Sequence, residues 1–373
     1  METFDAVVVG GGPAGSTCAW TLHRAGLKVT VLDRAIFPRD KVCAGWITPG
    51  VVDLLDLDVE EYRAGRVFQP IAAFRTALMG SREIVTRYRE PVSFLIRRCE
   101  FDHYLLQRSG AHVRCGQPVS SLRRVSDRWI VNDQISAPML VGAGGHFCPV
   151  ARRLNRQRPT APVVATLEME VRVRDDQLAQ CTVQRDTPAL YFCRDLKGYG
   201  WCFRKDCFLN VGLGRQDPHH LPRHTHAFLA FLKSQRSVPQ DLPAPSRGHA
   251  YLLYDGRSRQ WIDDGVLVVG DAAGLAEPHS GEGIKPAIES GLLAASTILD
   301  AGGKYGRERL EPYRRSLEAR FGAGGFTSHF GRAVPSWFVH RIAGTLMGSR
   351  WFTRRVLLDR WFLGAHRDPP DIF

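Results

Sequence analysis

The chain has 373 residues, of which 44% are hydrophobic and 24% charged, so a disordered or collagen-like chain is excluded. Its net charge of +12 comes from dispersed arginines without a nucleic-acid-binding motif, and we therefore expect no nucleic-acid partner. The nine cysteines form no Cys-x-x-Cys pair, which excludes a zinc site or a secreted disulfide framework, so we expect no bound metal and a cytoplasmic location.

The first thirty or so residues predict a βαβ unit. Residues 4–10 are a short valine-rich run that ends in glycine, which is typical of a buried parallel strand. A helix is expected from residue 13 to about residue 26, because Pro13 suits a first helical turn and Gly26 suits a C-terminal stop. Residues 27–33 then predict a second strand.

The turn inside this unit carries the pattern Gly-x-Gly-x-x-Gly. Its first glycine permits the tight turn, its second lets the backbone approach a diphosphate, and its third lets the helix pack closely on the strand. Free N–H groups at the helix start favour the anion, and a carboxylate at Asp33 can accept hydrogen bonds from the adenosine ribose. The motif predicts a dinucleotide site without separating FAD from NAD(P). The expected contacts are Gly10, Gly12, Pro13, Ala14, Gly15, Asp33 and Arg34.

The later part of the chain predicts an antiparallel sheet, followed by further elements of the parallel layer that begins at the N-terminus. Alternating stretches at residues 163–173 and 207–213 indicate an antiparallel sheet within residues 163–214. The other expected elements are a helix over 95–107, a buried strand over 139–142, a helix with loops over 215–245, a parallel strand over 266–270 and a helix over 284–299.

A second motif, which begins at the end of the strand over 266–270, selects flavin. Asp271 is placed to bind ribityl or diphosphate groups. The following loop leads into a second helix, whose first N–H groups can stabilise the negative charge of a reduced flavin at its N1/C2=O edge. The expected contacts are Gly270, Asp271, Gly281, Gly283 and Ile284.

We therefore predict an α/β fold in which a Rossmann-type FAD-binding domain is interrupted by an antiparallel-sheet substrate domain and followed by a helical C-terminal region. The expected FAD-binding domain comprises residues 1–70, 95–160 and 250–302, the substrate domain residues 71–94 and 161–249, and the C-terminal region residues 303–373.

Residues 10–15, 97–105 and 268–284 together resemble the geranylgeranyl reductase family of FAD-dependent oxidoreductases, which is related to aromatic hydroxylases and flavin halogenases. The resemblance covers roughly residues 1–300. Within residues 97–105 the family's Arg-x-x-Phe-Asp-x-x-Leu pattern starts at Arg98, which implies that Arg98 contacts FAD. From the residues alone, Arg98 could also be a solvated arginine at a helix start.

Two further segments are similar to the substrate side of this family. Residues 41–46 resemble its segment with a cysteine next to glycine, which implies that Cys43 faces the flavin and the substrate. Residues 199–203 resemble its Tyr-x-Trp-x-Phe-Pro motif, although Arg204 replaces the proline. Trp46, Tyr199 and Trp201 could line an apolar substrate cavity or pack as ordinary core.

Two side chains are candidates for chemistry. The Cys43 thiol could donate a proton to the substrate, or it could fill space as a small buried hydrophobe. Disulfide exchange is not expected, because the next cysteine is Cys99. His279 could act as an acid or base or steady the flavin edge, or it could cap the loop.

The best hypothesis is an FAD-dependent oxidoreductase that reduces a C=C bond of a hydrophobic, possibly isoprenoid, substrate. An FAD-dependent monooxygenase for an aromatic or other electron-rich substrate stays open, as does a non-enzymatic electron-relay protein. No second dinucleotide motif follows a strand, so NAD(P)H or another electron carrier would visit the flavin transiently. Flavin halogenases use a lysine between the flavin and the substrate, and residues 42–196 contain no lysine, so halogenase chemistry is disfavoured. Related aromatic hydroxylases carry an Asp-Gly motif near residue 140, and glycine replaces this aspartate within residues 141–145, so hydroxylase chemistry is disfavoured as well.

The C-terminal region is rich in arginine and aromatic residues. Helices of this composition can lie on an acidic membrane surface, or they can form a cover over the substrate domain, which is the favoured alternative. No apolar run is long enough to span a membrane, so peripheral contact is the membrane hypothesis that remains. Nothing in the sequence sets an oligomeric state. The residues concerned are Trp337, Phe338, Arg341, Arg350, Trp351, Phe352, Arg354, Arg355, Arg360, Trp361 and Phe362.

Overall fold

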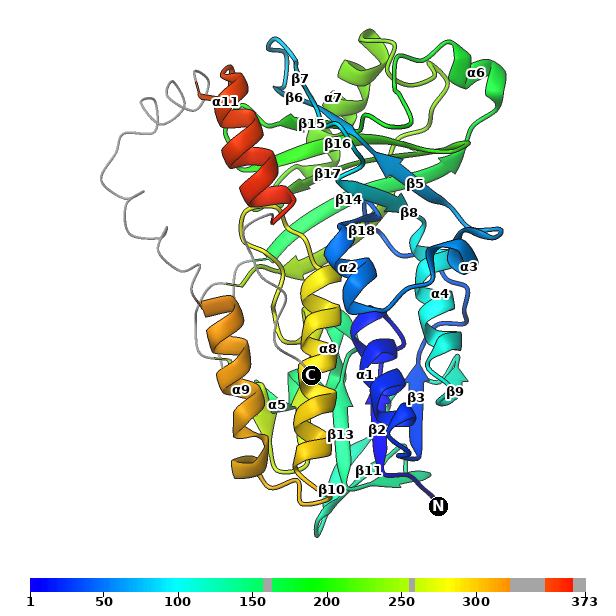
Figure 1. Ribbon diagram of the computed structural model, residues 1–373, viewed down its shortest axis with the longest axis vertical. Helices are drawn as coiled ribbons and strands as arrows, with labels where there is room; N and C mark the ends of the chain where they lie inside the picture. The colour runs from blue at the N-terminus through cyan, green and yellow to red at the C-terminus, as the bar shows by residue number, and fades with distance from the viewer. Residues whose placement is uncertain (157–162, 255–258, 323–345, 365–373) are drawn as a thin grey trace, which may run out of the picture.

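The computed structural model describes residues 1–156, 163–254, 259–322 and 346–364. Two large sheets organise this part of the chain, and they occupy the lower and upper halves of Figure 1. The lower half holds a largely parallel sheet flanked by long helices, and the upper half holds a largely antiparallel sheet.

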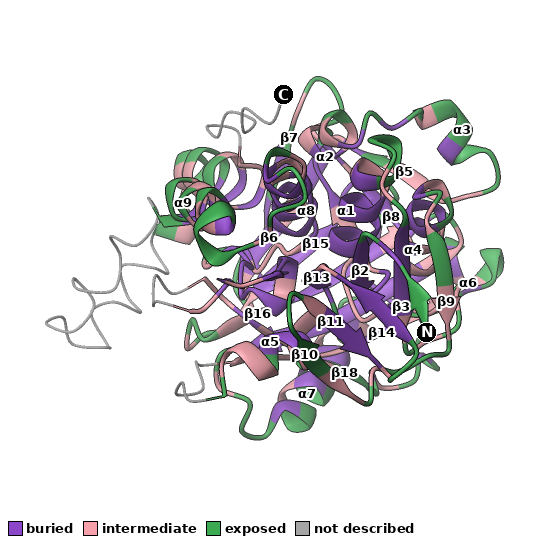
Figure 2. Ribbon diagram, turned by 90° about the horizontal axis from the view of Figure 1, so that it is seen from below, coloured by how far each residue is buried: buried purple, intermediate pink, exposed green. Residues whose placement is uncertain are grey.

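The parallel layer is a six-stranded sheet whose strands are buried at its centre (Figure 2). Valine and leucine dominate these strands because both faces are covered and water reaches neither. All neighbouring strands are parallel except the edge pair β19–β20. In sheet order the strands are β19 Ile262–Asp263, β20 Val266–Val268, β13 Met139–Gly142, β2 Ala6–Val9, β3 Val29–Asp33 and β9 His112–Cys115.

Long helices flank this sheet, and α1 and α8 lie side by side in Figure 1. A Cβ at Gly291 would lie 2.5 Å from the Ala14 carbonyl oxygen, so the close approach of α8 to α1 requires glycine there. The helices of this layer are α1 Pro13–Arg24, α4 Arg98–Arg108, α5 Pro149–Leu154, α8 Ile284–Asp300 and α9 Arg307–Gly322.

The second layer is a seven-stranded sheet, antiparallel except where β15 pairs with β6. The pairing of β14 and β16 with β17 confirms the antiparallel sheet expected within residues 163–214. Helix α7, Leu221–Ser234, packs on this sheet, where a Cβ at Gly200 would collide with Phe228 at 2.6 Å. In order the strands are β18 Arg247–Leu252, β14 Val163–Arg172, β17 Phe208–Arg215, β16 Gly198–Lys205, β15 Ala189–Phe192, β6 Ala73–Leu78 and β7 Ile84–Arg87.

Two small sheets and several short helices complete the described chain. The four-stranded sheet contains β1 Glu2–Thr3, β12 Ile135–Ala137, β11 Arg128–Val131 and β10 Leu122–Val125, and the three-stranded sheet contains β4 Trp46–Ile47, β8 Ser93–Ile96 and β5 Phe68–Ile71. The remaining helices are α2 Pro49–Leu54, α3 Val59–Arg63, α6 Asp175–Ala179, α7 Leu221–Ser234, α11 Arg350–Phe352, a π-helix over Thr353–Phe362 and 3₁₀ turns over Gly145–Phe147 and Gly270–Ala272.

Two expected boundaries are wrong by a few residues. The helix expected from residue 95 begins at Arg98, because Leu95 belongs to β8 and pairs with Trp46 and Gln69. The strand expected over residues 266–270 ends at Val268, because Gly270 has a φ of +61° and opens a 3₁₀ turn. The division into domains stays a prediction.

The described parts of the C-terminal region are helical, from α9 to the π-helix that continues α11. Trp337, Phe338 and Arg341, which the sequence placed on amphipathic helices, lie outside the described residues. Among the residues that the structure describes, no helix is long and apolar enough to cross a membrane.

Candidate functional site

A cavity of about 1250 Å³ is lined by residues from both large sheets. One part of its wall is formed where β2, β3 and β13 end, and another by β14, β16 and β18 of the seven-stranded sheet. Ligands of open α/β sheets bind outside the carboxyl ends of the strands. The cavity therefore lies where the dinucleotide motif predicts a cofactor.

The glycine-rich loop between β2 and α1 forms one wall of this cavity. Gly10 has a φ of +115°, and a Cβ there would lie 2.4 Å from a backbone oxygen. A Cβ at Gly15 would lie 1.9 Å from the Gly10 carbonyl oxygen, so the helix can meet the strand only through glycine. The nearest atom to a Cβ at Gly12 is a guanidinium nitrogen at 3.6 Å, which leaves that backbone open. Pro13 and Ala14 also line the cavity.

Asp33 lies at the end of β3 and holds the glycine loop in place. Its two carboxylate oxygens accept the backbone N–H groups of Gly11 and Ala35, each at 2.8 Å. Each oxygen keeps a second lone pair for a ligand hydroxyl. Asp33 and Arg34 both line the cavity, and the ribose contact expected for Asp33 stays a prediction.

Arg98 begins α4 and is buried beside the cavity. Its guanidinium forms two hydrogen bonds to the Asp102 carboxylate, at 2.7 and 2.8 Å. Arg39 contacts the same carboxylate at 3.1 Å. Two guanidinium groups thus share one fully buried carboxylate, and the cluster carries one positive charge in excess. Such an excess suits an anionic cofactor.

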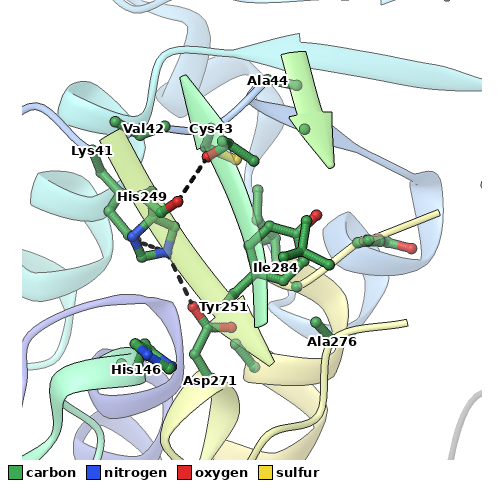
Figure 3. Close-up of a pocket in the computed structure, with 18 of the residues that line it drawn as sticks. Lys41, Val42, Cys43, Ala44, His146, His249, Tyr251, Asp271, Ala276 and Ile284 are labelled. Carbon is green, nitrogen blue, oxygen red and sulfur yellow. Dashed lines mark hydrogen bonds and ion pairs between the residues drawn. The ribbon is translucent and has the colours of Figure 1, made fainter. Parts of the chain in front are cut away.

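The late flavin motif meets a lysine and a histidine that sequence analysis left without a role. Lys41 Nζ lies 2.6 Å from His249 Nε2, which in turn lies 3.7 Å from Asp271 Oδ2 (Figure 3). Burial lowers the pKa of Lys41 to about 8, although the Asp271 charge opposes this effect. Burial favours neutral Asp271, but the nearby His249 imidazole and the Lys41 charge hold the pKa of that carboxyl below its usual value. The cluster therefore places a half-buried lysine in the cavity wall.

Cys43 is half-buried and faces the cavity from residues 41–46. Its Sγ accepts the Gly45 N–H at 3.3 Å, and Asn210 Nδ2 donates to its carbonyl oxygen at 3.2 Å. Gly45 has a φ of +64°, and a Cβ there would lie 2.1 Å from the Ile96 carbonyl oxygen, so this turn requires glycine. These contacts hold the thiol in one place at the cavity surface.

The loop that follows Asp271 enters α8 through two cavity-lining glycines. Gly281 has a φ of +71°, and a Cβ there would lie 2.5 Å from the Tyr251 hydroxyl. Gly283 precedes Ile284, the first residue of α8. A Cβ placed on Gly270 would lie 3.1 Å from the Ala14 Cβ, so the late motif packs against the start of α1. The structure thus brings the early and late motifs to one cavity.

The C-terminal π-helix contributes two aromatic side chains to this cavity. Phe362 stacks on Trp46, with ring centroids 5.4 Å apart and planes at 16°, and meets Tyr199 edge-on at 5.5 Å. Trp361 stacks on His279 at 5.2 Å and 11°. His279 therefore has a packing partner, and its role as an acid or base stays a prediction.

The two remaining substrate candidates differ in what their polar atoms do. Tyr199 donates its hydroxyl to the Ser280 carbonyl oxygen at 2.5 Å, which ties β16 to the late loop. Trp201 is 5% exposed and donates its Nε1–H to Asn210 Oδ1 at 2.6 Å. Trp201 touches the cavity mainly as part of the core beneath it.

The residues present fit FAD on two observations. The open backbone at Gly12 offers N–H groups to a diphosphate, and Arg98 and Lys41 supply positive charge in the same wall. Sequence analysis missed Lys41, although it lies two positions before Cys43, and it also missed His249 and the cavity position of Phe362. In the part of the chain that the structure describes, no group of three His, Cys, Asp or Glu residues could hold a metal ion.

Comparisons with known proteins place the chain in a family. A family model described as "FAD binding domain" matches residues 3–320. Digeranylgeranylglycerophospholipid reductase 3 of Methanosphaera stadtmanae is 26% identical over 349 residues, which cover 86% of this chain and 84% of that protein. Menaquinone reductase of Mycobacterium tuberculosis is 28% identical over 346 residues, which cover 87% and 82%.

A solved structure has a similar fold. A geranylgeranyl bacteriochlorophyll reductase-like protein of Thermoplasma acidophilum superposes with a TM-score of 0.74 at 21% identity, covering 95% of this chain and 93% of that one. At this identity the likeness concerns the fold, in which an FAD-binding sheet is combined with further sheets.

Proposed function

Because this chain belongs to the FAD binding domain family and is an FAD-dependent oxidoreductase of the geranylgeranyl reductase type, we propose that it reduces a C=C bond of a hydrophobic, isoprenoid-type substrate. The observation that carries the proposal is the aromatic part of the cavity wall, formed by Trp46, Tyr199 and Phe362. The names of relatives that act on geranylgeranyl compounds support it. Bound FAD, once reduced, supplies the hydride for such a reaction.

Cofactor binding is assigned to the residues that line the cavity near the two glycine motifs. The N–H groups after Gly12 bind the diphosphate, with Lys41 and Arg98 neutralising its charge. Asp33 accepts the ribose hydroxyls and Asp271 those of the ribityl chain. The start of α8 stabilises the charge on the reduced flavin, since the N-terminal end of a 17-residue helix carries a partial positive charge.

Substrate binding is assigned to the aromatic wall. Trp46, Tyr199 and Phe362 present ring faces and edges that bind an apolar chain and exclude water from it. Tyr199 has its only polar atom already bonded to the Ser280 carbonyl oxygen, so it offers the substrate an apolar surface. Phe192 meets both Tyr199 and Phe362 and extends this wall.

The proton for the second alkene carbon is assigned to the Cys43 thiol. The thiol is held at the cavity surface by the Gly45 N–H and by the backbone bond from Asn210. His279, stacked on Trp361, positions the loop beside the flavin edge in this proposal. NAD(P)H or another electron carrier reduces the flavin between turnovers.

A lipid-like substrate also gives the C-terminal segment a role. Trp351 is 68% exposed, and Arg354 and Arg355 are exposed beside it. This composition supports peripheral contact between a cytoplasmic protein and an anionic membrane surface, from which an isoprenoid lipid would reach the cavity.

The proposal is tested by mixing the reduced holoprotein with geranylgeranyl lipid under anaerobic conditions. Recovery of the oxidised flavin spectrum, together with a product heavier by two hydrogens, is the expected result. A flavin C4a adduct on mixing with oxygen and an aromatic substrate would instead establish the monooxygenase alternative. If the flavin is neither reoxidised by the lipid nor converted to a C4a adduct, the remaining alternative is a non-enzymatic electron-relay protein.

The role of the thiol is tested separately. Cys43→Ala should slow reoxidation by about 100-fold, the usual contribution of a positioned acid, without changing FAD binding. Cys207→Ala is the matched control, because Cys207 is also half-buried but does not line the cavity. Unchanged turnover of Cys43→Ala at saturating substrate would remove the thiol from the mechanism.

A further inference from the structure

A buried carboxyl group behind residues 41–46 has no role in the function proposed above. Glu168 lies on β14, is 4% exposed and lines the main cavity. Its Oε1 accepts Asn210 Nδ2 at 3.0 Å, and the same nitrogen donates to the Cys43 carbonyl oxygen. Its Oε2 is buried without a hydrogen-bond partner among the described residues. An unpaired buried oxygen is far less costly on a neutral acid than on a carboxylate.

The next inward carboxyl on the same strand is arranged in the opposite way. Glu170 accepts Lys205 Nζ at 2.7 Å and Arg97 Nε at 2.9 Å. Although burial favours its neutral form, these two cations hold the pKa of Glu170 below its usual value. For Glu168, burial raises the pKa to about 7, and the charges of Lys205 and Glu170 act on it in opposite directions. Two neighbouring carboxyls with separated pKa values are a common arrangement at proton-transfer sites.

A second cavity lies between Glu168 and two exposed side chains. This cavity of about 20 Å³ is large enough for one water molecule. Asp40 and Arg247 lie in its wall and form an ion pair at 2.5 Å whose side chains are 58% and 61% exposed. Glu168 lines both this polar cavity and the main one. The other titratable groups in the polar cavity's wall are Lys41, Cys43, Arg98, Cys99 and Glu170.

We propose that Glu168 is the proton reservoir of the site and carries protons from the small polar cavity to the Cys43 thiol in the main one. This inference rests on the proposed reductase function. The hydride, with both electrons, would come to one alkene carbon from FAD bound in its reduced form, and the Cys43 S–H bond breaks as the second C–H bond forms. The Glu168 O–H proton then restores the S–H bond, and a proton from bulk solvent, passed through water in the small cavity, restores the O–H bond. Lys205 and Asn210 stabilise the transient Glu168 carboxylate.

Infrared difference spectra of the holoprotein test the reservoir without any substrate. A C=O band of a protonated carboxylic acid should disappear as the pH rises through about 7, and it should be absent from Glu168→Gln. Glu90→Gln, at an exposed position, should keep the band. In D₂O the acid proton of Glu168 should exchange promptly for deuterium and shift the C=O band, because the exposed Asp40–Arg247 pair lies in the wall of the small cavity. A band that titrates like an ordinary carboxyl, or that does not exchange, overturns the proposal.

Anaerobic reoxidation by the lipid substrate tests the transfer itself. Glu168→Gln should slow it by about tenfold or more at pH 7, and Glu168→Asp should restore part of the rate with a displaced pH profile. An unchanged rate and pH profile in Glu168→Gln would overturn the relay. If the wild-type protein reduces no isoprenoid lipid, the proposed function fails, and the infrared titration and exchange still decide whether Glu168 stores a solvent-derived proton.

Discussion

Replacing Glu168 by glutamine should stabilise the protein at alkaline pH more than at acidic pH. The side chain is 4% exposed and one of its oxygens is unpaired, so its ionisation inside the fold is unfavourable. Burial raises its pKa to about 7 from 4.5. The folded chain therefore holds this proton more tightly than the unfolded chain does, and the wild-type protein loses stability as the pH rises from about 4.5 to about 7.

The size of this loss follows from the separation of the two pKa values. It reaches about 3 kcal/mol once the group is ionised in both states, and it is about 1 kcal/mol at pH 5. Glutamine is neutral at every pH and removes the loss. The free energy of unfolding of Glu168→Gln, minus that of wild type, should therefore increase by about 2 kcal/mol between pH 5 and pH 8.

Urea unfolding of the holoproteins, followed by circular dichroism at one fixed FAD concentration, measures this difference. A pH-independent cost of placing an amide at this position cancels in the comparison. Glu90→Gln should differ from wild type by less than about 0.5 kcal/mol at both pH values, because the group is exposed. A difference for Glu168→Gln that stays constant or falls at pH 8 would mean that Glu168 is an ionised partner of Lys205, and the reasoning would be refuted.

Three other outcomes follow from the geometry of the cavity. Gly15→Ala should prevent FAD loading, seen as loss of the flavin spectrum on purification, because its Cβ would lie 1.9 Å from a backbone oxygen; Gly306→Ala, with 3.9 Å to its nearest neighbour, should load normally. The FAD dissociation constant, measured by flavin fluorescence, should rise above about pH 8 as Lys41 loses its proton, and Lys41→Met should bind FAD more weakly but without this pH dependence. Phe362→Ala should raise KM for an isoprenoid substrate by about tenfold with FAD binding unchanged, because it removes the ring that stacks on Trp46 in the cavity wall. The side chain of Trp351 is 68% exposed, so Trp351→Ala should weaken only binding to lipid vesicles. Unchanged KM in the first variant would contradict the assignment of the aromatic wall.

The glycine motif and its surroundings could be predicted because their causes are local. Gly15 is required by its contact with the Gly10 carbonyl oxygen inside one strand–turn–helix unit, and the buried valines of β2 give that strand its pattern. The same holds for the late loop, where Gly283 leads directly into α8. Where a boundary depended on a distant partner, as at Leu95 in β8, the sequence pattern placed it wrongly.

The cavity's chemistry depended on contacts that no local pattern encodes. Lys41 and His249 are 208 positions apart in the chain, yet their nitrogens lie 2.6 Å apart. Phe362 was expected on a surface helix or cover, and the structure places its ring against Trp46. These pairings arise from the packing of segments that lie far apart in the chain.

The sequence by itself determined that the chain has two glycine motifs for one flavin, because turn geometry and helix starts depend on residues a few positions apart. Only the tertiary structure decided which polar groups surround that flavin site. Glu168 reads in the sequence as one more acidic residue of an alternating strand. Its burial beside Asn210 and the Cys43 backbone, with one oxygen unpaired, makes it a candidate proton store. The ionisation of a side chain is set by the solvent and charges that packing leaves around it, and these come from distant parts of the chain.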